Sequence, residues 1–145
     1  MSASGIGAIP ADHPLALGLV ARNGPYQANH AARQADVLLA LGVRFDDRTS
    51  SSWIPGFSFT IPPTKLIHVD IDPEEIGRNY PVALGLMADV RTFMRQLLGE
   101  INTRMGKGDM PAERSPWLDA IARYRKEWND FIAPGFKADA TPIEP

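Results

Sequence analysis

The segment from residue 42 to residue 48 carries the side chains best suited to bind a ligand. It follows the apolar run Val37–Leu41, and ligands of open α/β sheets bind beyond the carboxyl ends of such strands. The glycine lets a ligand approach the backbone, the two arginines offer forked donors for phosphate, and the two aspartates can accept from ribityl or ribose hydroxyls. A solvated ion-pair network is the alternative interpretation. The candidate binding residues are Gly42, Val43, Arg44, Phe45, Asp46, Asp47 and Arg48.

Acidic residues follow two further predicted strands. Asp70-Ile71 ends the second apolar run and Asp89-Val90 follows the third, and an acid at such a strand end often holds a sugar hydroxyl of a nucleotide. For Asp72 and Asp89 a helix N-cap is the stronger interpretation. Three such strand ends along one sheet edge would form a groove for an elongated dinucleotide.

Three other motifs give weaker signals. The stretch Gly5–Pro10 approaches the dinucleotide pattern G-x-G-x-x-G but has proline in the sixth place and no strand before it, which favours a glycine-rich turn. Asp12-His13-Pro14 is more typical of a turn than of an acid–base pair. His30 and His68 are isolated, which favours a helix surface for His30 and a buried strand for His68 over metal ligation.

The elements that must position these residues alternate between strand and helix. An alanine-rich stretch predicts a short helix over residues 29–35, and three apolar runs predict strands over Val37–Leu41, Leu66–Asp70 and, more weakly, Val82–Met87. Continuous apolar runs are typical of parallel strands buried on both faces. The sequence therefore predicts an α/β fold, a Rossmann-like doubly wound parallel sheet in three layers.

Two helices are predicted after the later strands. Asp72-Pro73-Glu74-Glu75 combines a capping acid with proline at the first helical position, which predicts a short helix from Pro73. Asp89 can cap a longer helix that we expect to pack on the sheet, because its apolar residues follow helical spacing. Those residues are Val90, Phe93, Met94, Leu97, Leu98 and Ile101.

A different kind of segment begins near residue 106. Residues 106–115 are polar and contain glycine and proline, so they are predicted to form a linker. A helix from Pro116 then carries an aromatic stripe, predicted to be a docking face rather than a ligand wall, and the proline-containing stretch 133–145 is predicted to be an extended connector. The stripe consists of Trp117, Ile121, Tyr124, Trp128 and Phe131.

Composition limits the classes of function. The chain has 145 residues, 44% of them hydrophobic, with a net charge of −2 and no cysteine. Nucleic acid is therefore a poor candidate ligand, and disulfides and thiolate metal sites are excluded. The apolar runs are far too short to span a membrane and the first residues do not resemble a secretory signal, so we expect a cytoplasmic protein without a membrane partner.

Three stretches carry a resemblance to a known family: GAIPADHPLALG, ADVLLALGVRFDDR and IHVDIDPEEIGRN. They are similar to the central domain of acetolactate synthase large subunits, which are thiamine-diphosphate-dependent enzymes, and the resemblance covers roughly residues 2–103. It implies a partial Rossmann-like domain whose first strands are missing. It also implies FAD contacts at the candidate residues given above: Gly42 to Arg48, Asp70, Ile71, Asp89 and Val90. The chain departs from the family's pattern in two places: the turn reads Arg22-Asn23-Gly24 instead of Met-His-Gly, and Ala88 replaces glycine.

The resemblance further implies a division of labour. Residues 1–105 would be the C-terminal part of the central domain, 106–115 a linker, and 116–145 an amphipathic helix and connector. Thiamine diphosphate and Mg²⁺ would bind to flanking pyrimidine- and diphosphate-binding domains, so we expect no catalytic residue and no activity in this chain alone.

The complete enzyme would be an oligomeric carboligase of 2-oxo acids, a transferase. The alternatives are the central domain of a 2-oxo acid or acyl-CoA decarboxylase of the same superfamily, with ADP or nothing in the groove, or a stand-alone binding module.

Overall fold

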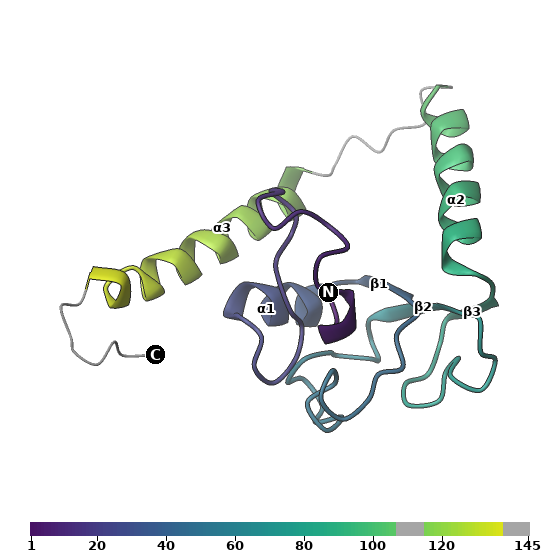
Figure 1. Cartoon of the computed structure of the whole chain (residues 1–145), viewed down its shortest axis with the longest axis horizontal. Helices are drawn as coiled ribbons and strands as arrows, with labels where there is room; N and C mark the ends of the chain where they lie inside the picture. The colour runs from purple at the N-terminus through teal and green to yellow at the C-terminus, as the bar shows by residue number, and fades with distance from the viewer. Residues whose placement is uncertain (107–114, 138–145) are drawn as a thin grey trace.

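The computed structural model describes residues 1–106 and 115–137 (Figure 1). A parallel sheet lies at its centre, and helices precede and follow the sheet along the chain. The elements are η1 (Ala3–Gly5), α1 (Tyr26–Gln34), β1 (Val37–Leu41), β2 (Lys65–Asp70), β3 (Leu84–Met87), α2 (Val90–Met105), α3 (Ser115–Ile132) and η2 (Gly135–Lys137). The bulk of the predicted linker, residues 107–114, and the tail 138–145 lie outside the described residues.

The sheet has three parallel strands in the order β1-β2-β3, which confirms the predicted α/β class and a partial Rossmann-like domain. Leu38 pairs with Leu66, and His68 pairs with Ala40 on one side and with Gly85 on the other. β1 coincides with its predicted run, because an apolar stretch that ends at a glycine gives a strong local signal.

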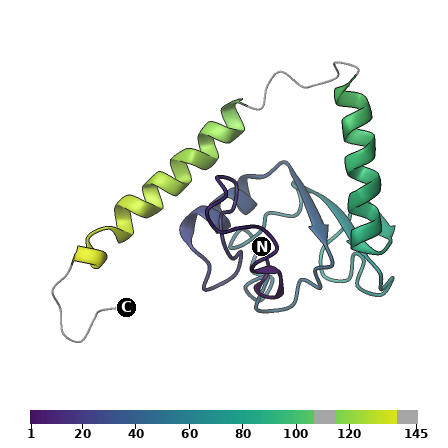
Figure 2. The same cartoon turned by 45° about the horizontal axis from the view of Figure 1, so that its top comes forward.

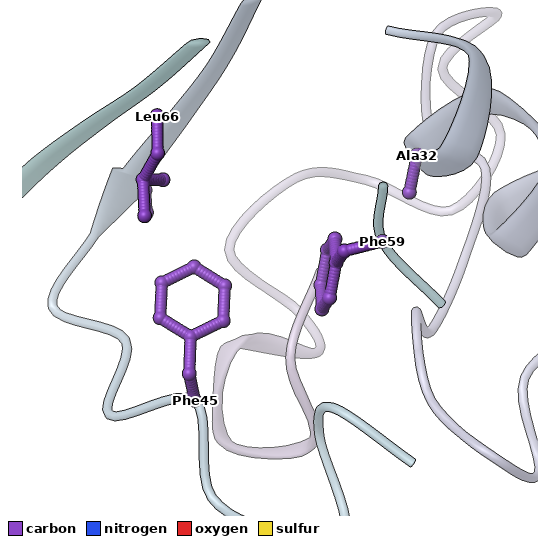
Figure 3. Close-up of a cluster of buried hydrophobic side chains, with 5 residues drawn as sticks. Ala32, Phe45, Phe59 and Leu66 are labelled. Atoms are coloured by element: carbon purple, nitrogen blue, oxygen red, sulfur yellow. The ribbon is translucent and has the colours of Figure 1, made fainter. Parts of the chain in front are cut away.

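The core lies against one face of this sheet. Phe45 and Phe59 pack edge to face, with ring centroids 5.4 Å apart, over Leu66, which is only 1% exposed. Figure 3 shows the Phe45 ring between Leu66 and Phe59, with Ala32 of α1 on the far side of Phe59. The long connection between β1 and β2, together with α1, therefore supplies the side chains that cover this face.

The prediction that all three strands are buried on both faces is wrong for β1 and β3. Only β2 is largely buried; Val37, Leu39 and Leu84 are exposed, and Met87 is 70% exposed. The reason is position, because β1 and β3 are the outer strands of the described sheet. An apolar run alone does not distinguish a central strand from an outer one.

The helix predicted from Pro73 is also wrong, because residues 73–77 form turns. The Asp72 side chain accepts from the Glu74 backbone N–H at 3.0 Å, as a cap would, but the backbone bonds that follow are short-range ones, such as Arg78 N–H to the Glu75 carbonyl. Gly77 then adopts a φ of +75°, which ends any helix. The capping signal was correct, and the chain turns back before a helix can propagate.

The longer helix α2 begins as predicted. The Asp89 side chain accepts from the Thr92 backbone N–H at 2.8 Å, and this bond is the main reason that the pKa of Asp89 is lowered. The expectation that α2 packs on the sheet is not met: no side chain of residues 90–105 is buried. The helix rises from the end of β3 and extends beyond the sheet (Figure 1, Figure 2).

The middle of the aromatic stripe confirms the docking interpretation. α3 lies beside α1, with Ile121 and Tyr124 buried, and the Tyr26 hydroxyl donates to a Glu127 carboxylate oxygen at 3.0 Å. His30 was predicted to lie on a helix surface. Instead it stacks on Tyr26 and meets Tyr124 edge to face at 4.5 Å between ring centroids. The sequence of α1 indicates only the alanine face that packs on the core. It does not show that α3 covers the face that carries His30.

The surroundings of His30 predict that the stability of the chain depends on pH. Burial lowers the pKa of His30, and the positive charges of Arg33 and Arg123 lower it further. The carboxylate of Glu127 raises it, but by less. The unfolded chain therefore binds the proton more readily, so stability is complete above the unfolded pKa of about 6.5 and falls as the pH drops below it.

We expect the urea midpoint to decrease between about pH 7 and pH 5.5, above the range in which the carboxylates titrate. We expect His30→Gln to reduce that decrease, and an unchanged pH dependence in the variant would contradict this assignment.

Candidate functional site

The carboxyl ends of the three strands meet at one edge, as predicted. The Gly42 backbone N–H donates to the Val69 carbonyl at 2.8 Å, and the Ala88 N–H donates to the Asp70 carbonyl at 2.9 Å. The ends of β1, β2 and β3 are thus joined directly by hydrogen bonds. We refer to the segment 42–48 with Asp70, Ile71, Asp89 and Val90 as the strand-end edge.

Gly42 keeps this edge open at its first strand. Its φ is +61°, a region that favours glycine, and a Cβ placed there would meet only Val90, at 3.6 Å. The residue is exposed, so a ligand can reach its backbone. The Val90 side chain therefore lies near Gly42, which places the start of α2 beside the end of β1.

The two arginines of the edge are exposed. The Arg44 side chain is 76% exposed and its Nε lies 3.9 Å from Glu75 Oε1, whereas Arg78 holds the same oxygen at 3.0 Å. The more distant Arg44 pair is weak at such exposure. Arg44 therefore keeps most of its donors available to a ligand. Arg48 is exposed as well.

The acidic residues of the edge are partly occupied by backbone groups. One oxygen of Asp46 accepts from the Thr49 N–H at 2.7 Å, and this bond is the main cause of the lowered pKa of Asp46. Asp70 is buried and accepts from the Asp72 N–H at 3.0 Å, and Asp89 caps α2. An ionised carboxylate has two oxygens, so each of these three can accept one more group. Asp47 is exposed.

Phe45 anchors the segment 42–48 to the core. Its side chain is 3% exposed, its φ is +51°, and its carbonyl accepts from Trp53 Nε1 at 2.8 Å and Asn79 Nδ2 at 3.1 Å. The side chain therefore belongs to the core. Val43 is half-buried against the same core, whereas Ile71 is exposed.

The long connection after the segment is tightly built. Ser51, Ser52 and Trp53 all have left-handed φ values between 55° and 58°, a conformation that non-glycine residues adopt at a cost and that is often found beside functional sites. The buried hydroxyls of Ser51 and Ser58 lie 2.6 Å apart and bond to each other. These contacts fix the loop that follows the two arginines.

Several residues near the edge were not predicted to belong to it. Arg22 donates to the Ser52 hydroxyl at 2.7 Å, and Asn79 holds two carbonyls of the segment. A cavity of about 400 Å³ opens beside Arg48. Its lining residues are Leu19, Ala21, Arg22, Asn23, Asp47, Arg48 and Thr49. These contacts join residues about 30 positions apart, which no local pattern reveals.

The weaker motifs are structural. Gly7 lies in a turn with a φ of +94°, and His13 Nδ1 accepts from the Leu15 N–H at 3.1 Å within the turn after Asp12. His68 is buried in β2 as predicted, with Nδ1 accepting from the Gly77 N–H at 3.4 Å. None of these three positions belongs to the strand-end edge.

Residues 1–97 match the family model described as "Thiamine pyrophosphate enzyme, central domain". The chain belongs to this family. All the residues of the strand-end edge lie within the matched part, whereas α3 lies outside it. Across residues 1–106 and 115–137, no helix of this family member combines the length and hydropathy needed to cross a membrane.

Curated relatives of this thiamine pyrophosphate enzyme domain include the "Probable acetolactate synthase large subunit" of Methanocaldococcus jannaschii. It is 36% identical over 141 residues, 97% of this chain and 22% of the relative. "Acetolactate synthase 1, chloroplastic" of Zea mays is 34% identical, over 97% of this chain and 20% of the relative. "Probable acetolactate synthase 2, chloroplastic" of Oryza sativa subsp. japonica is 45% identical, over 86% of this chain and 18% of the relative. The chain thus spans about a fifth of the length of these relatives.

Proposed function

We propose that this chain provides part of the central domain of an acetolactate synthase-like carboligase acting on 2-oxo acids. The observation that carries the proposal is the strand-end edge: an open glycine, two exposed arginines and spare carboxylate oxygens, all within the family-matched residues. The named acetolactate synthases that align with 97% of the chain support the same function.

In this proposal the chain binds a dinucleotide, and the reaction itself takes place in the flanking domains. Thiamine diphosphate supplies an electron sink for decarboxylation and carbon–carbon bond formation when it is bound. We expect the groups that hold it and Mg²⁺ to belong to the flanking pyrimidine- and diphosphate-binding domains, which would be the partners of residues 1–105 in a cytoplasmic oligomer. The chain alone should then have no activity with pyruvate.

The residues of the strand-end edge fit a flavin or adenine dinucleotide. The exposed guanidinium groups of Arg44 and Arg48 suit its phosphates, and the second oxygens of Asp46, Asp70 and Asp89 suit its hydroxyls. Among the residues that the structure describes, Glu75 Oε2 is buried without a partner. The other oxygen of Glu75 lies 3.9 Å from Arg44 Nε, too far at this exposure to hold the guanidinium, so Arg44 stays available to a ligand.

We expect Arg44→Ala to weaken FAD binding about tenfold, equivalent to ~1.4 kcal/mol, because the dinucleotide loses a charge-assisted donor. The measurement is quenching of FAD fluorescence during titration with the full chain, with ADP as a competitor to show whether the adenine half suffices. The matched control is Arg95→Ala, which removes the same charge from an exposed position on α2.

Two results would contradict the flavin assignment. One is equal binding by both variants and the unchanged chain, and the other is binding that Arg95→Ala weakens as much as Arg44→Ala does. Displacement of FAD by ADP at similar affinity would instead favour the alternative superfamily member that holds an adenine nucleotide in the same groove.

A further inference from the structure

A second cavity lies where α1 and α3 meet, away from the strand-end edge. Its volume is about 470 Å³, and its walls are Tyr26 of α1 and Glu127, Trp128 and Phe131 of α3. The helices lie side by side there (Figure 1). Three of the four walls are therefore aromatic rings, and the fourth is a carboxylate.

The aromatic rings leave much of their surface open to water. The centroids of Trp128 and Phe131 are 5.8 Å apart with the planes tilted by 32°. Phe131 is 75% exposed and Tyr26 is 37% exposed. The faces of such rings carry partial negative charge, which attracts a cation and does not attract a neutral group of the same shape.

The carboxylate of Glu127 is held in place by the cavity itself. Its Oε2 accepts from the Tyr26 hydroxyl at 3.0 Å, a bond that raises the pKa of the phenol and keeps it a donor. The other oxygen lies 3.8 Å from Arg123 Nε, a long pair whose guanidinium also lies 5.3 Å from the centre of the Tyr124 ring. Negative charge is thus presented beside the three aromatic residues of the cavity.

We propose that Tyr26, Glu127, Trp128 and Phe131 form a binding site for a small organic cation, a quaternary or methylated ammonium group. Each methyl group of such a cation replaces an N–H donor, so the cation is more weakly hydrated than ammonium and loses less when it leaves water for the aromatic rings, and its charge is matched by Glu127. The three α3 residues lie beyond the family-matched residues 1–97, so the proposal does not depend on the flavin assignment.

The test uses the full, ¹⁵N-labelled chain and its three tryptophan indole N–H signals, from Trp53, Trp117 and Trp128. Tetramethylammonium chloride is titrated at constant ionic strength against sodium chloride. We expect the Trp128 signal to shift and saturate in the millimolar range, while the Trp53 and Trp117 signals stay in place. The neutral analogue tert-butanol should need at least fivefold higher concentration for the same shift.

Two variants separate the site from the fold. Phe131→Ala removes an exposed ring and should raise the dissociation constant at least threefold. Glu127→Gln keeps an acceptor for the Tyr26 hydroxyl but removes the charge, and should raise it at least fivefold. Trp117→Phe, at the other end of α3, should change nothing.

The proposal is overturned if the Trp128 signal does not saturate, if tert-butanol acts as well as the cation, or if both cavity variants bind like the unchanged chain.

Discussion

Replacing Phe45 with alanine should remove about 3–5 kcal/mol from the free energy of unfolding. The ring is the centre of the core: its centroid lies 5.3–5.4 Å from those of Phe59, His68 and Tyr80, and the side chain is almost fully buried. Domains of this size have a total stability of about 5–15 kcal/mol, so the variant should be close to unfolding. Urea denaturation followed by circular dichroism measures the loss.

The matched control for this prediction is Phe57→Ala. Phe57 lies in the same long connection but is 42% exposed, so its removal should change stability by no more than about 0.5 kcal/mol. Similar losses in the two variants would mean that the Phe45 ring does not centre the core as described.

The second large effect is expected at Gly24, which lies in the turn before α1. A Cβ at this position would lie 2.0 Å from the Leu19 carbonyl oxygen and 3.1 Å from the Ala21 nitrogen. Both are backbone atoms of a turn that is tied to α1, because Asn29 Oδ1 accepts from the Ala21 N–H and Asn29 Nδ2 donates to the carbonyls of Ala21 and Gly24. Gly24→Ala should therefore cost about 3 kcal/mol or more, since the turn itself must move.

Gly99→Ala provides a control of opposite sign. Gly99 lies inside α2 with nothing within 4 Å of the added Cβ, and alanine is favoured over glycine in a helix by about 1 kcal/mol. The thermal midpoint should fall strongly for the Gly24 variant and stay level or rise for the Gly99 variant. Equal stability of the Gly24 variant and the unchanged chain would contradict the described turn.

Features that depend on neighbours in sequence could be predicted. The run Val37–Leu41 ended by Gly42 identified β1, and Asp89 identified the start of α2 because a cap bonds within three residues. The meeting of the three strand ends also followed from sequence, since parallel strands place their carboxyl ends at one edge.

Features that depend on distant neighbours could not be predicted. The helix expected from Pro73 fails where Gly77 turns the chain, and the Cβ position of Gly85 lies 2.6 Å from Ile76, so the turn is shaped by β3. The prediction for His30 was wrong because the sequence of α1 does not show that α3 covers this residue. The candidate site was incomplete for the same reason: Asn79 bonds to two carbonyls of the segment and Arg22 to Ser52 just beyond it, across 30 to 35 positions of sequence.

Mutational tolerance follows from the position of α2. Because none of the side chains at residues 90–105 is buried, polar replacements at Leu98 or Ile101 take little buried area away from the folded chain. The same replacements shrink an exposed apolar surface of the kind that causes proteins to aggregate. Solubility and folding stability, which are coupled in a core helix, are therefore independently adjustable along this helix.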